Sequence, residues 1–248
     1  MWARGFLDGC ALARHDPPAT IEFAIGHRAW RTLRVLEAAG RKFGPGDVGR
    51  LVCQPETANL RSLYASALDV QQIAASRDAP RVIELAIAPA GLPIHSVLTH
   101  LHAGCFERLR RLHLFGAVPA MLSQLERPEL ALIAIAQPVT IAGWLAAVEE
   151  RSSRLTEVRL VSGVFPFLER RGLELVLQPD PDHHWNRLEI RWTADNEPRL
   201  RDQVIQALAQ LPEGAIQRLS FVGPTAARFD VARWRHRVTA AVPGAIVE

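Results

Sequence analysis

Histidines and aspartates at short spacings are the residues of this chain best suited to metal chemistry. His95, His100 and His102 fall within one predicted helical segment. Helical ligand pairs stand three or four residues apart so that both imidazoles share a face. The spacings here are five, two and seven. Asp182-His183-His184 follows Pro179-Asp180-Pro181, a composition typical of a turn. We therefore predict no metal site.

Nucleophilic and phosphate-binding motifs are the next candidates. The sequence has no G-x-S-x-G turn, no G-x-x-x-x-G-K-[ST] loop and no G-x-G-x-x-G turn. Cys10, Cys53 and Cys105 are isolated and form no C-x-x-C pair, which is typical of reduced thiols in a cytosol. We predict a protein that is not an enzyme, with no catalytic residue and no cofactor.

Composition and charge indicate an ordinary globular chain. The 248 residues are 48% hydrophobic and 22% charged, which excludes wholesale disorder. The net charge is +3, and Lys42 is the sole lysine, so arginine supplies nearly all the basic charge. We find neither the apolar core of a signal peptide nor a run of about 18 apolar residues. These features predict a cytoplasmic protein without a membrane partner.

A repeated six-residue pattern, apolar-x-x-apolar-x-apolar, organises the chain. Copies begin at residues 30, 60, 82, 109, 130, 155, 185 and 216. Each predicts a short strand, and residues 173–177 add a degenerate one. Helices are predicted between the copies, at 45–53, 67–76, 93–103, 118–125, 141–150 and 199–211. The N-terminal part is predicted to form a strand at 5–13 and a helix at 21–28. The C-terminal part is predicted to form a helix at 231–241 and a strand at 245–247.

Two α/β architectures fit repeated strand–helix units: a closed (β/α)8 barrel and an open leucine-rich-repeat-like solenoid. Barrel strands are apolar on both faces, whereas these copies carry polar residues such as Arg111, Glu157 and Arg187 between the apolar ones. One face must therefore be wet, because each unpaired buried charge would cost several kcal/mol. We predict the solenoid as a single domain over 1–248, with an opening unit at 1–29, repeats at 30–222 and a capping helix at 223–248.

The copies resemble leucine-rich repeats. The opening Trp2-Ala-Arg-Gly5-Phe6-Leu7 is similar to the segment that begins the repeat region of bacterial repeat-companion domain proteins of myxobacteria and planctomycetes. The resemblance covers the repeat region and not the companion domain. It implies a parallel sheet on the concave face, short helices on the convex face, and a bacterial origin. The asparagine ladder of leucine-rich repeats is missing.

The wet face of the predicted sheet is the candidate site. Its area, on the order of 700 Å², suits one side of a protein interface, where Arg and Tyr are enriched. We predict a non-catalytic adaptor or accessory protein that binds another protein through Arg34, Tyr64, Arg111, His113, Arg159, Arg187 and Arg218. Membership of a larger complex is one form that this binding can take. One alternative is a nucleic-acid-binding accessory protein that uses the arginine-rich surface, including Arg228, Arg233, Arg235 and Arg237 around Trp234. The other is a (β/α)8-barrel enzyme.

Overall fold

The α/β fold of the chain consists of a mostly parallel, open sheet and helices in two compact units, residues 1–115 and 116–248. A computed structural model describes residues 2–3, 6–11, 25–38, 46–88, 94–125, 130–135, 140–151, 155–162, 172–193, 198–224 and 229–248. Within these residues no helix is long and apolar enough to span a bilayer.

Unit 1 (residues 1–115) begins with an antiparallel hairpin of β1 (Trp2–Ala3) and β2 (Phe6–Leu7). Parallel strands then lie side by side in chain order. They are β3 (Gly9–Ala11), β4 (Val35–Glu37), β5 (Ser62–Ser66), β6 (Glu84–Ala88) and β7 (Arg111–Phe115). Parallel neighbours need a crossover connection, which the helices between the strands supply.

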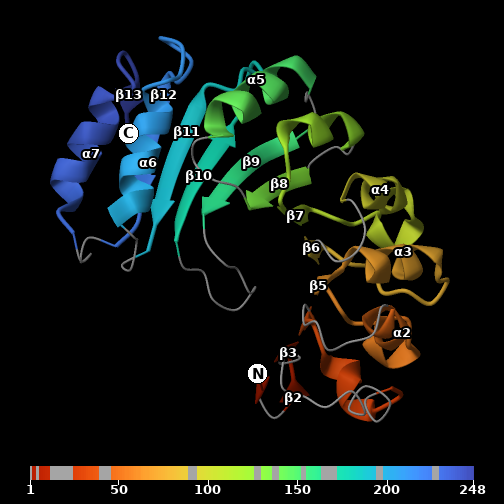
Figure 1. Cartoon of the computed structure of the whole chain (residues 1–248). Helices are drawn as coiled ribbons and strands as arrows, with labels where there is room; N and C mark the ends of the chain where they lie inside the picture. Colours follow the sequence, from red (N-terminus) through yellow and green to blue (C-terminus); the bar gives the residue numbers. More distant parts are fainter. Residues whose placement is uncertain are drawn as a thin grey trace. The chain divides into compact units, whose positions relative to one another are not determined.

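Short helices connect the strands of unit 1, several of them single 3-10 turns. They are η1 (Arg28–Thr32), α2 (Asp47–Val52), η2 (Pro55–Thr57), α3 (Ala67–Ala75), α4 (Ile94–Leu98), η3 (Thr99–His102) and η4 (Gly104–Phe106). Figure 1 shows α2, α3 and α4 on the same side of the strands of this unit. Buried residues of α3 and α4, such as Val70, Ile73 and Leu98, pack toward that side of the sheet.

One buried carboxylate joins two helices of unit 1. Asp69, which is 3% exposed, closes a capping box with Ser66 at the start of α3. Its Oδ1 also accepts a hydrogen bond of 3.0 Å from the backbone N–H of Gly49 in α2. The side chain therefore satisfies backbone donors of two consecutive connections.

Unit 2 (residues 116–248) has longer strands and one reversal of direction. Its strands are β8 (Leu130–Ile135), β9 (Leu155–Ser162), β10 (Leu173–Gln178), β11 (Arg187–Trp192), β12 (Arg218–Val222) and β13 (Ile246–Val247). β10 pairs antiparallel with both β9 and β11, whereas β8 with β9, β11 with β12 and β12 with β13 pair parallel. The degenerate strand predicted at 173–177 therefore exists, and it runs against its neighbours.

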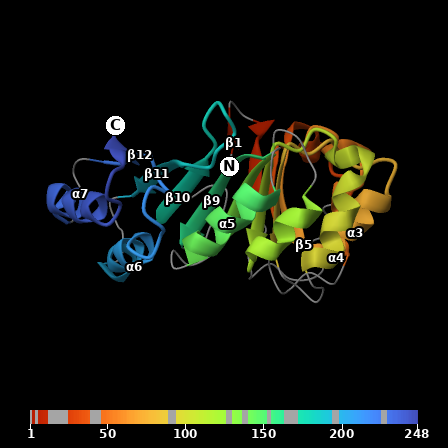
Figure 2. The same cartoon turned by 90° about the horizontal axis from the view of Figure 1, so that it is seen from above.

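The helices of unit 2 are η5 (Pro119–Gln124), α5 (Ile141–Arg151), α6 (Pro198–Leu208) and α7 (Val231–Ala240). In Figure 2, α5 and α6 lie along one face of β9 to β11. An aromatic cluster joins the sheet to α7: the indole of Trp234 lies 5.6 Å from the indole of Trp192 and 6.3 Å from the phenyl ring of Phe221, between ring centroids. Gly223 lies against Trp192 so closely that a Cβ there would come within 2.3 Å of the indole.

The predicted strands are largely confirmed, with two register corrections. Each copy from residue 60 onward contains a strand. The first copy, however, is Leu33-x-x-Leu36-x-Ala38 rather than one beginning at Trp30, because Leu36 pairs with Leu63 and Trp30 belongs to η1. The second correction is a bulge at Leu130/Ala131, which places Leu132 beside Val158. The helix predicted at 21–28 lies mostly outside the described residues.

The sheet is open, so the barrel architecture is wrong for this chain. The strand order runs from one edge strand, β3, to another, β13. Strand burial also alternates, as expected for one wet face: Leu188, Ile190 and Trp192 of β11 are buried, and the residues between them are partly exposed. The prediction of a single domain over 1–248, with its opening, repeat and capping parts, stays a prediction.

A repeated backbone hydrogen bond marks the start of the strands. A carbonyl just before one strand accepts two consecutive N–H groups from the start of the next strand. The accepting carbonyls belong to Asp8, Arg34, Arg61 and Ile83 in unit 1 and to Asn186 in unit 2. These bonds satisfy the backbone between neighbouring repeats at the leading ends of the strands, a function that side-chain ladders serve in other repeat proteins.

Candidate functional site

The polar face of the unit 1 sheet consists of two described rows of residues that run across the strands. The first row is Gly9, Val35, Ser62, Glu84 and Arg111, and the second is Ala11, Glu37, Tyr64, Ala86 and His113. Leu63, Leu85 and Leu112 are fully buried between these rows, on the helix-facing side. Predicted site residues Tyr64, Arg111 and His113 thus share one face.

Two aromatic rings stack on this face. Tyr64 of β5 and Phe115 of β7 lie 5.3 Å apart between centroids at an interplanar angle of 15°. Beyond Glu84, the strand between them, β6, carries the small residues Ala86 and Ala88 on this side, which leaves room for the rings to meet above it. Both aromatic residues remain partly exposed. Partly exposed aromatic pairs of this kind are typical anchors in protein interfaces.

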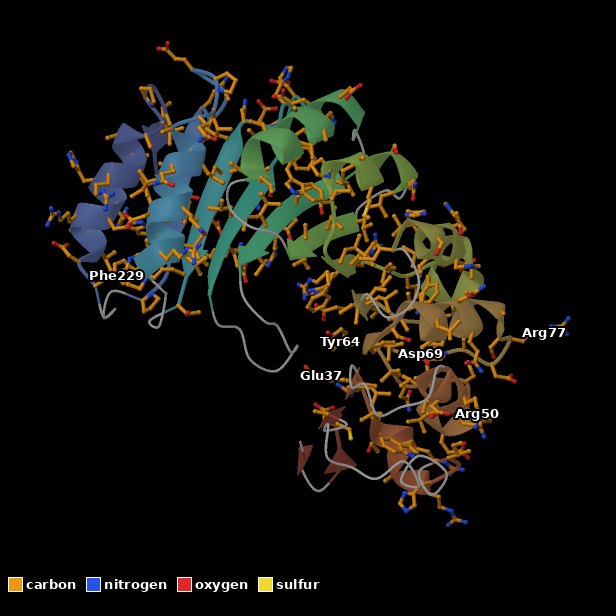
Figure 3. All side chains as sticks on the ribbon, viewed as in Figure 1. Glu37, Arg50, Tyr64, Asp69, Arg77 and Phe229 are labelled. Carbon is orange, nitrogen blue, oxygen red and sulfur yellow. The ribbon has the colours of Figure 1, made fainter. Side chains whose placement is uncertain are left out.

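Carboxylates flank the aromatic pair. Glu37, 8% exposed, is the cross-strand neighbour of Tyr64. Burial, and then the charge of Glu37, raise the pKa of the Tyr64 hydroxyl. In Figure 3, Glu37 and Tyr64 lie on one side of the unit 1 strands, whereas Asp69, Arg50 and Arg77 lie among the helices.

A side-chain hydrogen bond crosses from β6 to β7. Nε2 of His113 lies 2.8 Å from Oε1 of Glu84, and Ser62 donates its hydroxyl to Oε2 of Glu84 at 3.2 Å. Burial alone would raise the pKa of Glu84, but the hydrogen bond and charge of His113, with Arg111 and Ser62, lower it below its ordinary value. Glu84 is therefore held ionised on this face.

Arg34 lies elsewhere than the pattern predicted. Because the first copy begins at Leu33, Glu37 stands beside Tyr64 and Arg34 lies just before β4. Its side chain is 72% exposed and its Nε is 3.7 Å from Oδ1 of Asp8. Its backbone carbonyl accepts a hydrogen bond from the backbone N–H of Arg61. The carbonyl of Arg61 accepts in the same way from Ile83, and the carbonyl of Ile83 accepts from Arg110. We call this set the leading column: Asp8, Arg34, Arg61, Ile83 and Arg110.

The polar face of the unit 2 sheet is covered by internal ion pairs. The Arg159 side chain is only 12% exposed; its Nε donates to Glu157 at 2.8 Å, and its Nη1 lies 3.7 Å from Glu174. Next along the sheet, Arg191 pairs with Glu189 on the same strand. The predicted site residue Arg159 is therefore committed to contacts within the chain.

The other two predicted arginines of unit 2 are cross-strand neighbours. Arg187 of β11 and Arg218 of β12 stand opposite each other. Arg218 turns to Glu248, with Nη1 at 2.9 Å from the carboxylate. Nε of Arg187 is buried without a hydrogen-bond partner among the described atoms. Arg187 and Arg218 are thus neighbours on the sheet of unit 2, whereas Tyr64 belongs to unit 1.

The remaining candidates do not assemble into a site. His95 and His102 are exposed on separate turns. Asp180 accepts backbone N–H groups of Asp182 and His184, which lowers the pKa of its carboxyl, with His184 the larger cause. No group of three His, Cys, Asp or Glu in the described parts of the chain could hold a metal ion.

The basic C-terminal helix makes contacts of its own. Arg235 lies over the ring of Phe221 at 4.6 Å, Arg201 over that of Phe229 at 4.0 Å, and Arg237 pairs with Asp202 at 3.1 Å. These arginines therefore bind aromatic and acidic groups of unit 2. Arg228 lies outside the described residues.

Sequence reasoning missed Phe115, Arg61 and Arg110. Phe115 follows His113 by two residues, and period-2 alternation alone would have placed it on the same face. Arg61 and Arg110 occupy the second position of their copies. The second positions form a column with Arg34 only when the first copy begins at Leu33, which the pairing of Leu36 with Leu63 shows and the sequence pattern does not.

No protein-family model matches the chain, and no curated protein matches it.

Proposed function

We propose that the chain is a divergent leucine-rich-repeat-like solenoid of bacterial origin that acts in the cytoplasm as a non-catalytic adaptor. Support for the repeat architecture comes from the parallel strand order, the in-register leucines Leu36, Leu63, Leu85 and Leu112, and the repeated carbonyl at the strand starts. In repeat proteins each unit buries its apolar face against its neighbours and leaves one sheet face for partners.

The partner is another protein, and it docks on the polar face of unit 1. The observation that carries this proposal is the stacked, partly exposed Tyr64–Phe115 pair beside the hydrogen-bonded Glu84 and His113 and the exposed Arg111. An aromatic centre with charged groups around it is the composition of an interface hot spot. Ala86 and Ala88 keep the neighbouring surface low, so that a partner side chain can reach the rings.

Arg159, Arg187 and Arg218 serve the fold of unit 2 in this proposal. Arg159 and Arg218 already pair with carboxylates of the chain. Releasing Arg159 would leave Glu157 and Glu174, whose side chains are each 13% exposed, without their cation. A partner would have to replace those contacts before gaining any affinity.

A capture comparison tests the proposed function. Immobilised wild type, Tyr64→Ala and the control Arg77→Glu are incubated with extract of cells that encode the chain, and bound proteins are quantified. Arg77 is an exposed residue in the turn that follows α3, among the helices of unit 1. We expect a set of proteins that Tyr64→Ala loses about tenfold and Arg77→Glu retains. Equal recovery on all three proteins overturns the proposal.

Nucleic-acid binding by the arginine-rich surface is the rival proposal. It has less support because Arg201 of α6 and Arg235 and Arg237 of α7 face aromatic rings or Asp202. It predicts an affinity for RNA or DNA that collapses between about 50 and 200 mM salt.

A further inference from the structure

The leading column carries three arginines that share one edge of the unit 1 sheet. Arg34, Arg61 and Arg110 directly precede β4, β5 and β7. The chain of backbone hydrogen bonds from Asp8 to Arg110 fixes their order across the strands. Neighbouring strands are about 4.8 Å apart, so the column from Arg34 to Arg110 spans about 15 Å.

The guanidinium groups of Arg34 and Arg61 have N–H donors beyond the contacts that they make within the chain. Arg34 is 72% exposed and its nearest carboxylate oxygen, on Asp8, is 3.7 Å away. Nη1 of Arg61 donates to the carbonyl of Leu60 at 3.2 Å, and a guanidinium carries five N–H donors. Arg110 is exposed. The arginines at this edge can therefore donate charge-assisted hydrogen bonds to carboxylates from outside the chain.

An apolar residue interrupts the arginines. Ile83 holds the column position between Arg61 and Arg110, and its side chain is 39% exposed. An exposed isoleucine flanked by arginines favours an occupant with an apolar side chain between acidic ones. A phosphate backbone offers no such group, so the column suits an acidic peptide better than a nucleic acid.

We propose that the leading column binds an extended acidic segment of the partner protein, with one apolar side chain seated on Ile83. An extended chain rises about 3.3 Å per residue, so about five residues cover the column and alternate side chains stand about 7 Å apart. This inference rests on the proposed function and names the chemistry of the segment that the partner presents at this edge.

Unit 2 shows by contrast what an edge without this role looks like. The residues just before β11 and β12 are Asn186 and Gln217, and the two side chains hydrogen-bond each other at 3.2 Å. Nδ2 of Asn186 also donates to the carboxylate of Asp180 at 2.8 Å, so this amide is engaged within the chain. Neither Asn186 nor Gln217 carries a positive charge that would attract a carboxylate from outside. The arginines of the leading column are thus not a general requirement for beginning a strand in this fold.

Fluorescence anisotropy with a labelled peptide tests the inference. The probe is a short peptide of alternating glutamate and glycine with one central leucine, titrated with the full chain at about 50 mM salt. We expect binding that weakens about tenfold to thirtyfold in the double variant Arg61→Glu/Arg110→Glu, and that is unchanged in Arg77→Glu. Unchanged thermal unfolding of both variants shows that the fold is intact.

Two further arms make the result decisive. Ile83→Ser weakens binding of the leucine peptide about threefold but not of a peptide with glycine at that place. A single-stranded oligonucleotide of the same charge binds more weakly than the peptide. Equal or tighter oligonucleotide binding, or no effect of the double variant, overturns the inference.

The outcomes separate the two proposals. If wild type does not bind the peptide while Tyr64→Ala still loses captured proteins, the inference of an acidic segment is wrong and the proposed protein-binding face is retained. If Tyr64→Ala loses nothing while the peptide binds through Arg61 and Arg110, the proposed face is wrong and the leading column is a site by itself.

Discussion

The two units use the same strand-and-helix plan and differ in what covers the polar face of their sheets. In the described part of unit 1 the face carries Tyr64 and Phe115, small residues and the His113–Glu84 contact. In unit 2 it carries Arg159 held by Glu157 and Glu174, and Arg191 held by Glu189. Residues 1–115 hold 14 Lys and Arg against 10 Asp and Glu, whereas residues 116–248 hold 15 against 16. The polar face of unit 2 is closed by ion pairs of the chain itself. We propose that the polar face of unit 1, which carries aromatic side chains in the unit with surplus positive charge, binds the partner.

Removing the central arginine of unit 2 has the largest expected effect. Arg159→Ala leaves Glu157 and Glu174, each 13% exposed, without their cation, and lowers the free energy of unfolding by about 3 kcal/mol. Arg111→Ala, on the exposed face of unit 1, changes it by less than about 0.5 kcal/mol. Urea unfolding measures both. Equal losses would show that the two faces do not differ.

Glycine substitutions test how tightly side chains pack against the backbone in each unit. Gly223→Ala drives a Cβ to within 2.3 Å of the Trp192 indole, which is itself packed against Trp234, and costs about 1–3 kcal/mol. Gly49→Ala in α2 meets chiefly the far end of the exposed Gln72 side chain, at 2.5 Å from Oε1, and costs less. Thermal unfolding of both variants checks the order. A larger loss for Gly49→Ala would contradict it.

The buried carboxylate of α3 supports the helix layer of unit 1. Asp69→Ala removes the capping box and the acceptor of the Gly49 N–H, and lowers the free energy of unfolding by about 1–2 kcal/mol. Because Asp69 lies on the helix-facing side, capture of partner proteins persists where the variant is folded. Loss of capture by folded Asp69→Ala would place the binding face on the helices instead.

The smallest expected effect is in acid. The pKa of Glu84 is lower in the folded chain than in the unfolded one, so its contribution is present above the unfolded value of about 4.3 and is lost as pH falls through the folded pKa. In Glu84→Gln the decline of stability below about pH 4.3 is shallower than in wild type. Chemical unfolding at a series of pH values checks this. Identical slopes for the two proteins would remove Glu84 from the account.

The sequence predicted the strands because alternate apolar residues indicate a strand with one buried face. It failed where the position of an element depends on which strand pairs with which. Trp30-x-x-Leu33-x-Val35 and Leu33-x-x-Leu36-x-Ala38 both fit the pattern, and only pairing with Leu63 selects the second. That shift moved Arg34 from the sheet face to its edge. The bulge at Leu130 and the reversed direction of β10 depend on neighbouring strands in the same way. Local periodicity does not encode which strand lies next to which.

Hydroxyl-radical footprinting of the chain, with and without the most strongly captured partner, tests the central claim most directly. The rings of Tyr64 and Phe115 are partly exposed in unit 1, and that of Phe221 is partly exposed in unit 2. We predict that the partner protects Tyr64 and Phe115 and leaves the oxidation rate of Phe221 unchanged. Protection confined to Phe221 and its surroundings, with Tyr64 and Phe115 still reactive, would contradict the assignment of the binding face to unit 1.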